Sequence, residues 1–243
     1  MNYLQLQNGI KLAYHRTEGT SPGIIFLSGF RSDMTGTKAT ALEAWAMAQG
    51  RAFLRFDYSG HGQSSGEFEK GTIGSWTQAA LAVFDELTQG PQILVGSSMG
   101  GWMALLLALA RPERVAGLVT VAAAPDFTTR LIWEQLTPQQ KQIMAEKGVY
   151  YAPSDYGDPY PITLNLIEES RQHLLLDDEI AIDCPMRLLH GMRDGDVPWE
   201  FSTRIAELLQ SPDVQVRLVK DGDHRMSEPE QIAMLIELVV GLA

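Results

Sequence analysis

Residues 96–100, Gly-Ser-Ser-Met-Gly, fit the pattern Gly-x-Ser-x-Gly. In this pattern the serine lies on a tight turn between a strand and a helix, and glycines let the backbone segments approach without Cβ clashes. Residues 92–95 have the composition of a strand and residues 101–110 that of a helix. This context predicts that Ser98 is a nucleophile at the carboxyl edge of a sheet, rather than part of a plain glycine-rich turn.

A serine hydroxyl needs a general base to become nucleophilic, and the base needs an acid that orients it. The chain has five histidines, of which His224 follows the last predicted strand. Loops at the carboxyl ends of parallel strands converge above the sheet, so His224 is the predicted base. The other four histidines are expected to lie in a hairpin, in turns or on a helix: His15, His61, His190 and His173.

The predicted acid is Asp194, which follows the seventh strand of the expected sheet. The chain order serine, acid, histidine is the one found with this serine turn. Asp196 lies two residues later, and Asp126 follows the sixth strand, where some hydrolases place the acid. The sequence favours Asp194 and leaves the other two carboxylates as alternatives.

The negative charge that develops on a substrate carbonyl oxygen needs two backbone N–H donors. Met99, the residue after the predicted nucleophile, is expected to supply one of them. The loop 28–30 follows the first buried strand and is expected to supply the other from Phe30, although a glycine loop of this kind also occurs as a simple connection.

Other chemistries find no support in the sequence. There is no His-Glu-x-x-His or Cys-x-x-Cys motif, so we expect no metal and no other cofactor. The glycines at 60, 62 and 66 lie one residue off the dinucleotide fingerprint and lack its strand-to-helix setting. Cys184 is the only cysteine, which excludes an internal disulfide. The net charge of −11 argues against a nucleic-acid partner.

The elements that position these residues alternate along the chain between short apolar runs and helical periodicities. Such alternation predicts βαβ units and a mostly parallel sheet buried on both faces, preceded here by a hairpin at Asn8-Gly9. The 45% apolar and 20% charged residues are those of a globular protein. The predicted strands are 24–27, 52–56, 93–95, 115–124, 186–189 and 214–219; the predicted helices are 37–49, 76–87, 99–110, 201–209 and 230–240.

The segment 125–183 interrupts this alternation with 59 residues, five prolines and two expected helical pieces, 129–136 and 162–175. A gap this long inside a compact domain indicates a functional insertion, which we expect to be a lid on a single domain, 1–243. Its eleven acids and four bases would repel anionic substrates if the acids border the entrance, unless a base such as Arg130 faces the pocket. Its aromatic residues are expected either to line an acyl pocket or only to pack the lid onto the sheet: Phe127, Trp133, Tyr150, Tyr151, Tyr156 and Tyr160.

With these residues the chain resembles the α/β-hydrolase superfamily over essentially its whole length, through the serine turn and the runs 57–64 and 190–198. A closer resemblance is to the family of α/β-hydrolase domain-containing protein ten. It implies an eight-stranded sheet with a helical lid, Asp194 as the acid, and hydrolysis of palmitoyl-protein thioesters or acyl glucuronides. The stretches that carry it include 36–39, 55–60, 90–98, 184–185, 187–192, 197–199 and 223–226.

We therefore expect a serine hydrolase that cleaves esters or thioesters of apolar acyl groups through an acyl-enzyme. Its substrate is expected to be a small molecule or an acylated protein. The N-terminus has no signal or Arg-rich transit pattern, and no apolar run approaches the 18 residues of a membrane span, which favours a bacterial-type cytoplasmic relative. A serine peptidase on the same residues and a ligand-binding receptor of the same fold stay open as alternatives, and the oligomeric state is not predicted.

Overall fold

The computed structural model describes residues 1–152 and 159–242, and an eight-stranded sheet lies at its centre. The strand order is β1-β2-β4-β3-β5-β6-β9-β10, and β2 runs in the direction opposite to the other seven strands. This sheet confirms the predicted eight-stranded, mostly parallel α/β architecture. The strands are β1 (Asn2–Gln5), β2 (Lys11–Thr17), β3 (Thr20–Leu27), β4 (Arg51–Phe56), β5 (Gln92–Ser97), β6 (Val115–Val121), β9 (Met186–Gly191) and β10 (Val214–Val219).

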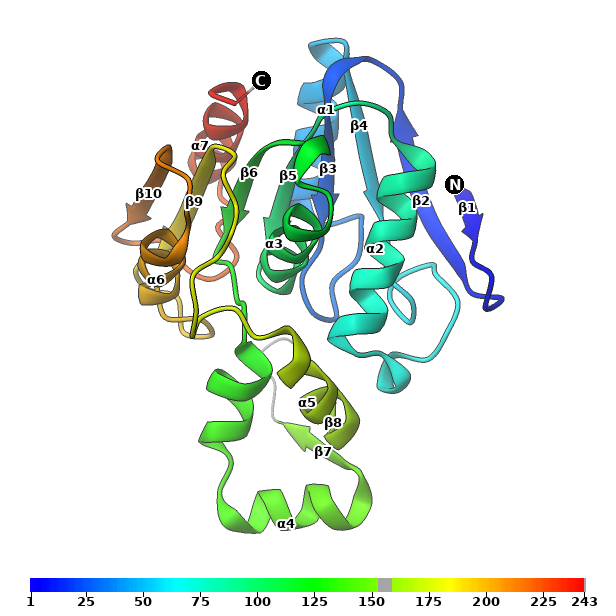
Figure 1. Ribbon diagram of the computed structural model, residues 1–243, viewed down its shortest axis with the longest axis vertical. Coiled ribbons are helices and arrows are strands. Elements are labelled where there is room, and N and C mark those ends of the chain that lie inside the picture. Colours follow the sequence, from blue (N-terminus) through cyan, green and yellow to red (C-terminus); the bar gives the residue numbers. More distant parts are fainter. Residues whose placement is uncertain (153–158, 243) are drawn as a thin grey trace.

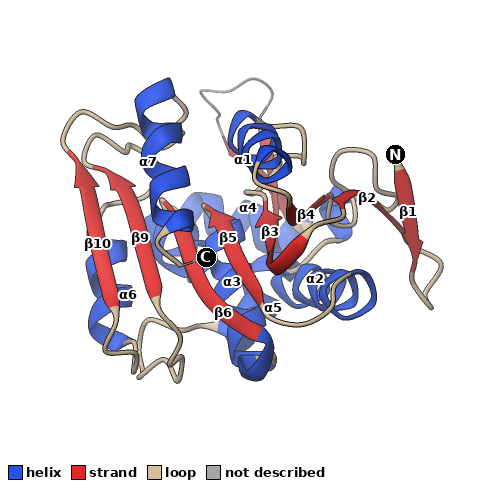
Figure 2. Ribbon diagram, turned by 90° about the horizontal axis from the view of Figure 1, so that it is seen from above, coloured by secondary structure: helices blue, strands red, loops and turns tan. Residues whose placement is uncertain are grey.

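Helices cover both faces of the sheet, as Figures 1 and 2 show. Figure 2 places α1 and α7 on one side of the sheet and α2, α3 and α6 on the other. Apolar side chains fill both interfaces, because the central parallel strands are buried on both sides; every residue of β5 is buried. The helices are α1 (Thr37–Ala48), α2 (Ile73–Leu87), α3 (Met99–Ala110), α6 (Glu200–Leu208) and α7 (Pro229–Val240).

The predicted elements of the sheet and its helices are all present, with small shifts at their ends. The largest shift among the helices is in α2, which begins at Ile73 instead of 76. Its N-terminus is stabilised by a reciprocal cap, in which the hydroxyl of Thr72 accepts from the N–H of Ser75 and the hydroxyl of Ser75 accepts from the N–H of Thr72. The cap uses two hydroxyl residues, so the usual acidic signal of a helix start is missing from the sequence.

The insertion, residues 125–183, lies between β6 and β9, the sixth and seventh strands of the main sheet, as expected. Figure 1 shows α4 (Pro138–Lys147), β7 (Val149–Ala152) and α5 (Leu164–Ser170) together beyond the carboxyl end of β6. β7 pairs with β8 (Tyr160–Thr163) in a separate two-stranded sheet. A small core of Met144, Ile162 and Ile167 holds these pieces together.

The predicted helices of the insertion are partly wrong. The segment 129–136 forms one π-helical turn and one 3-10 turn, and 162–175 contains the end of β8, the short α5 and a 3-10 turn. α4 is absent from the predicted helices, although Thr137, Pro138 and Gln140 have the residue types of a helix start. In the structure Pro138 is the first helical residue, where no N–H is needed, and the hydroxyl of Thr137 caps the N–H of Gln140.

No helix among the described residues has both the length and the apolar character that a membrane crossing requires.

Candidate active site

Ser98 lies between β5 and α3 in a conformation that side chains rarely adopt, with φ 55° and ψ −121°. Its N–H donates to the carbonyl of Val121 at 2.9 Å, and its carbonyl accepts from Gly101 and Ala124 at 2.8 and 3.1 Å. The turn is therefore fixed from both sides, by α3 and by β6 with the residues that follow it.

The two glycines of the serine turn are required by its packing. A Cβ atom at Gly96 would lie 2.3 Å from the carbonyl oxygen of Gly100, and one at Gly100 would lie 2.0 Å from the carbonyl oxygen of Leu27. Both clashes are with backbone, which cannot move aside as a side chain can. Glycine is therefore needed at both positions of the motif because the backbones of β3, β5 and α3 approach closely there.

The structure brings Ser98, His224 and Asp194 together from the loops after β5, β10 and β9. His224 Nε2 lies 3.1 Å from Ser98 Oγ, and His224 Nδ1 lies 2.7 Å from Asp194 Oδ2. The other carboxylate oxygen, Asp194 Oδ1, accepts from the N–H groups of Asp196 and Val197, both at 2.8 Å. The acid Asp194, the base His224 and the hydroxyl of Ser98 are thus joined by hydrogen bonds in this order, as removal of the serine proton requires.

The Asp194 side chain is fully buried. Burial has the largest influence and acts to raise its pKa, but hydrogen bonds from His190, His224 and the N–H of Val197 outweigh it and hold the pKa of Asp194 well below its usual range. The carboxylate is therefore ionised at any pH at which the protein works. It accepts the Nδ1 proton of His224, which leaves Nε2 facing the Ser98 hydroxyl.

Of the two alternative acids, Asp126 is hydrogen-bonded within the insertion, whereas a carboxylate oxygen of Asp196 lies within 4.8 Å of His224. Asp126 is buried, and its carboxylate accepts from the N–H groups of Leu175 and Leu176 at 2.8 and 2.9 Å, with Arg130 Nε at 3.4 Å. Burial is the main reason that its pKa is raised. It connects the beginning of the insertion to its end instead of contacting His224. Asp196 is exposed, and its own N–H binds Asp194.

In the described part of the chain, Asp194, Asp196 and His224 form a group that could hold a metal ion, with one ligand atom from each within 4.8 Å of the others. Asp194 Oδ2 and His224 Nδ1 already bind each other at 2.7 Å. A cation would have to displace that hydrogen bond, so the geometry favours proton transfer over metal binding.

The loop after β3, which carries the predicted donor Phe30, lies directly against the serine. A Cβ atom at Gly29 would be 3.3 Å from the Cβ of Ser98, and Phe30 and Met99 both line the same cavity as Ser98. The next residue, Arg31, has φ 56°, and its N–H donates to His61 Nε2 at 3.3 Å. The expected oxyanion donors thus lie beside Ser98, and their role stays a prediction.

His61 supports this loop, a role that the sequence did not suggest beyond a structural turn. Its ring is buried against Phe68 and Trp76, and Nδ1 lies 3.2 Å from the carbonyl of Ser59. Burial lowers the pKa of His61 to about 4, so the ring is neutral near pH 7 and Nε2 is free to accept from Arg31. The other histidines have local partners: His15 pairs with Glu43, His173 with Glu169, and His190 with Asp194.

A cavity of about 690 Å³ opens over Ser98 and His224. Its apolar wall comes largely from the insertion, and two of the predicted aromatic residues, Phe127 and Tyr160, belong to it. Trp133, Tyr150 and Tyr151 instead contact Lys141, Gln140 and Glu69, and Tyr156 lies outside the described residues. The insertion residues that line the cavity are Phe127, Leu131, Ile132, Ala152, Tyr160 and Ile162.

Anionic substrates would be repelled only if acids of the insertion bordered the entrance, and this condition is not met among the described residues. No acid of the insertion in the described ranges lines the cavity, and Asp155 and Asp158 lie outside them. Arg130 does not line it either, because it pairs with Asp126 and Asp177. The charged lining residues come from the main domain, three bases and two acids: Arg31, Lys38, Arg225, Asp33 and Asp196.

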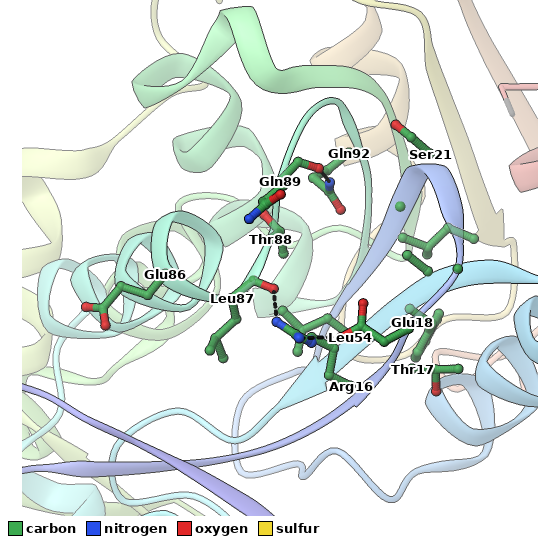
Figure 3. Close-up of a pocket in the computed structure, with 15 residues that line it drawn as sticks. Arg16, Thr17, Glu18, Ser21, Leu54, Glu86, Leu87, Thr88, Gln89 and Gln92 are labelled. Atoms are coloured by element: carbon green, nitrogen blue, oxygen red, sulfur yellow. Dashed lines mark hydrogen bonds and ion pairs between the residues drawn. The ribbon is translucent and has the colours of Figure 1, made fainter.

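A second, smaller cavity of about 280 Å³ lies at the opposite edge of the sheet, beside the start of β5 (Figure 3). Its polar groups bind one another: Arg16 donates to the carbonyl of Leu87 and pairs with Glu18, and the Gln92 amide donates to the carbonyl of Gln89. These contacts explain its shape without a ligand, and we assign none to it.

Comparison with known proteins agrees with this geometry. A family model described as alpha/beta hydrolase fold matches residues 39–148. Palmitoyl-protein thioesterase ABHD10, mitochondrial, from Homo sapiens is 44% identical over 238 residues, 97% of this chain and 78% of the relative. The Bos taurus protein of the same name is 46% identical over 227 residues, 93% of this chain and 74% of the relative.

Two solved structures are also similar over almost the whole chain. Alpha/beta hydrolase domain-containing protein 10 from mouse has a TM-score of 0.92 and 42% identity, covering 99% of this chain and 97% of that chain. A putative hydrolase from Agrobacterium vitis has a TM-score of 0.94 and 38% identity, covering 100% of this chain and 97% of that chain.

The packing of the serine turn generates a prediction. Gly100→Ala should lower the free energy of unfolding by about 1–3 kcal/mol, because the added methyl group meets the backbone of Leu27, and it should remove most hydrolytic activity by displacing Ser98. The matched control is Gly241→Ala, whose Cβ would make only ordinary contacts of 3.6 Å or more. Thermal unfolding and turnover of both variants would check this, and an active, stable Gly100→Ala protein would contradict it.

Proposed function

The chain belongs to the α/β-hydrolase superfamily, as a relative of the ABHD10 thioesterases, and we propose that Ser98, His224 and Asp194 are its catalytic residues. It is an esterase or thioesterase. The observation that carries the assignment is the continuous hydrogen bonding from Asp194 Oδ2 through the His224 ring to Ser98 Oγ, with distances of 2.7 and 3.1 Å.

The proposed reaction has two similar halves. His224 Nε2 takes the hydroxyl proton as Ser98 Oγ attacks the acyl carbonyl carbon, and the N–H groups of Met99 and Phe30 stabilise the oxyanion. The tetrahedral intermediate collapses, the thiolate or alkoxide leaves with the proton from His224, and the acyl group stays on Ser98. Water then attacks the acyl-enzyme, with His224 again as the base. The carboxylic acid is released and the Ser98 hydroxyl is regenerated.

The cavity supports an apolar acyl group. Its volume and its apolar wall, with Phe127, Leu131 and Ile162, are those of a site that binds a hydrophobic ligand. The relatives are named palmitoyl-protein thioesterases, so we propose long-chain acyl thioesters, including acylated proteins, as the substrate class. Small acyl esters and acyl glucuronides are oxygen esters that the same mechanism would cleave, and a purified protein should be tested against them as well.

We further propose that the chain is one domain in which the insertion serves as a lid. Support comes from the cavity, since its walls are formed by the loops after β3 and β5 on one side and the insertion on the other. The curated relatives are named as mitochondrial, so a cytoplasmic location for this chain is a proposal that cell fractionation would test.

The assignment of Ser98 is tested by labelling and turnover together. A fluorophosphonate probe should label the wild-type protein and fail to label Ser98→Ala, and Ser98→Ala should lose thioester turnover by a factor on the order of 10⁶ in kcat. Its thermal unfolding should stay close to that of the wild type, because only one oxygen is removed. Retention of more than a few per cent of activity would refute the nucleophile, and an unlabelled wild type would favour a ligand-binding receptor.

The choice of acid is tested by two matched substitutions. Asp194→Asn should lower kcat by a factor on the order of 10⁴, because the amide cannot hold the reactive tautomer of His224. Asp126→Asn should affect unfolding more than kcat, because Asp126 binds the N–H groups of Leu175 and Leu176. Turnover and unfolding of both variants decide the matter, and the reverse order of kcat losses would assign the acid to Asp126.

The charges at the cavity predict the response to an anionic leaving group. Burial, its largest influence, lowers the pKa of Lys38 to about 8, so Lys38 is mainly charged at pH 7 and loses its charge above pH 8. Between about 20 and 200 mM salt, kcat/KM should fall more for an acyl glucuronide than for a neutral ester of the same acyl group, because screening weakens the attraction. The difference between the two substrates in this salt effect should be smaller in Lys38→Met and at pH 9. If added salt instead raised kcat/KM more for the acyl glucuronide than for the neutral ester, the entrance would be repulsive to anions.

A further inference from the structure

His190 is the last residue but one of β9 and precedes the turn that carries Asp194. Its side chain is fully buried, with Nε2 at 3.1 Å from Asp194 Oδ2 and 3.0 Å from the carbonyl oxygen of Val197. On the other side of the ring, Nδ1 lies 2.7 Å from the hydroxyl of Ser202, which is buried in α6. Every polar atom of the ring therefore has a protein partner.

These partners fix where the His190 ring carries its proton. The carbonyl of Val197 can only accept, and the Asp194 carboxylate is ionised, so Nε2 must be the donor. Among the described residues the Ser202 hydroxyl binds only Nδ1, and it can donate only if Nδ1 carries no proton. The arrangement is fully satisfied by a neutral imidazole with its proton on Nε2.

Asp194 consequently accepts four hydrogen bonds. Oδ1 accepts two backbone N–H groups, from Asp196 and Val197, whereas Oδ2 accepts the two imidazoles, His224 at 2.7 Å and His190 at 3.1 Å. A hydrogen bond to a buried carboxylate disperses its charge, which is one reason that the pKa of Asp194 is held low. The hydrogen bond from His190 therefore weakens the attraction between the Asp194 carboxylate and the proton on His224.

We propose that His190 is a positioning residue of the active site, which fixes Asp194 and limits how strongly that carboxylate stabilises the protonated form of His224. This rests on the proposed function, in which His224 is the base for Ser98. Without His190, Oδ2 of Asp194 would accept a hydrogen bond from His224 alone. His224 would then keep its proton to higher pH and could act as a base over a narrower range of pH.

Other charged groups near this hydrogen-bonded set come from several elements. Asp196 lies on the same loop as Asp194, and Lys38 on α1 donates to the carbonyl of Arg225, next to His224, with Asp223 nearby. Arg193 and Asp221 pair at the exposed ends of the two loops. All of these groups are retained in the variants below, so the difference between variants measures the hydrogen bond of His190.

The test compares His190→Leu with His190→Gln, which keeps an N–H donor on a side chain of similar reach. In the profile of kcat/KM against pH, the rising midpoint should move up by about one pH unit in His190→Leu, and kcat at pH 7 should fall about tenfold with KM nearly unchanged. His190→Gln should restore most of both. A merely structural role would lower the melting temperature and the amount of active protein without moving the midpoint.

A second measurement needs no substitution and decides the matter if His190→Leu does not fold. In ¹⁵N-resolved NMR of the wild-type protein, His190 should show a proton on Nε2 and none on Nδ1 from pH 6 to 9. A proton on Nδ1, or an unchanged midpoint in a folded His190→Leu, would overturn the proposal. Failure of the proposed function is recognised separately, because Ser98→Ala would then stay active.

Discussion

The site depends on one backbone constraint, the left-handed conformation of Ser98 at the point where β5 becomes α3. A side chain in this region costs on the order of 1–3 kcal/mol, and it persists only where the surroundings impose it. Here hydrogen bonds to Val121, Gly101 and Ala124 impose it, and glycines at 96 and 100 make room for the carbonyl groups that approach most closely. The direction of the hydroxyl and the start of α3 both follow from this turn.

Two buried histidines hold the rest of the machinery around that turn, on opposite sides of it. His61 accepts the N–H of Arg31 and so fixes the loop that carries Phe30, whereas His190 donates to Asp194 and so fixes the acid behind His224. Each has both ring nitrogens occupied by protein groups, with one nitrogen donating and the other accepting. Neutral imidazoles suit this task because they can join a donor to an acceptor across a space that water does not enter.

The parts of the site that could be predicted are those that depend on local backbone chemistry. The glycines around Ser98 and the positions of Asp194 and His224 after strands are visible in the sequence, because a turn and a strand leave a pattern in neighbouring residues. The partners of His61 and His190 depend on chain segments that meet only in the folded protein. The position of the insertion's acids could not be predicted for a related reason: a count of acids gives no information on which side of a segment they face.

Asp126 gives the insertion a particular relation to the remaining fold. Asp126 is the second residue of the insertion, and its carboxylate binds the N–H groups of Leu175 and Leu176, about fifty residues later. The insertion is thus a loop closed at its base, and closure entropy changes only slowly with the length of what lies between the closed ends. Evolution can lengthen, shorten or replace the segment beyond Asp126 without disturbing β6 or β9. Under the proposed function, exchange of this one segment would change which acyl group is accepted while Ser98, Asp194 and His224 keep their places.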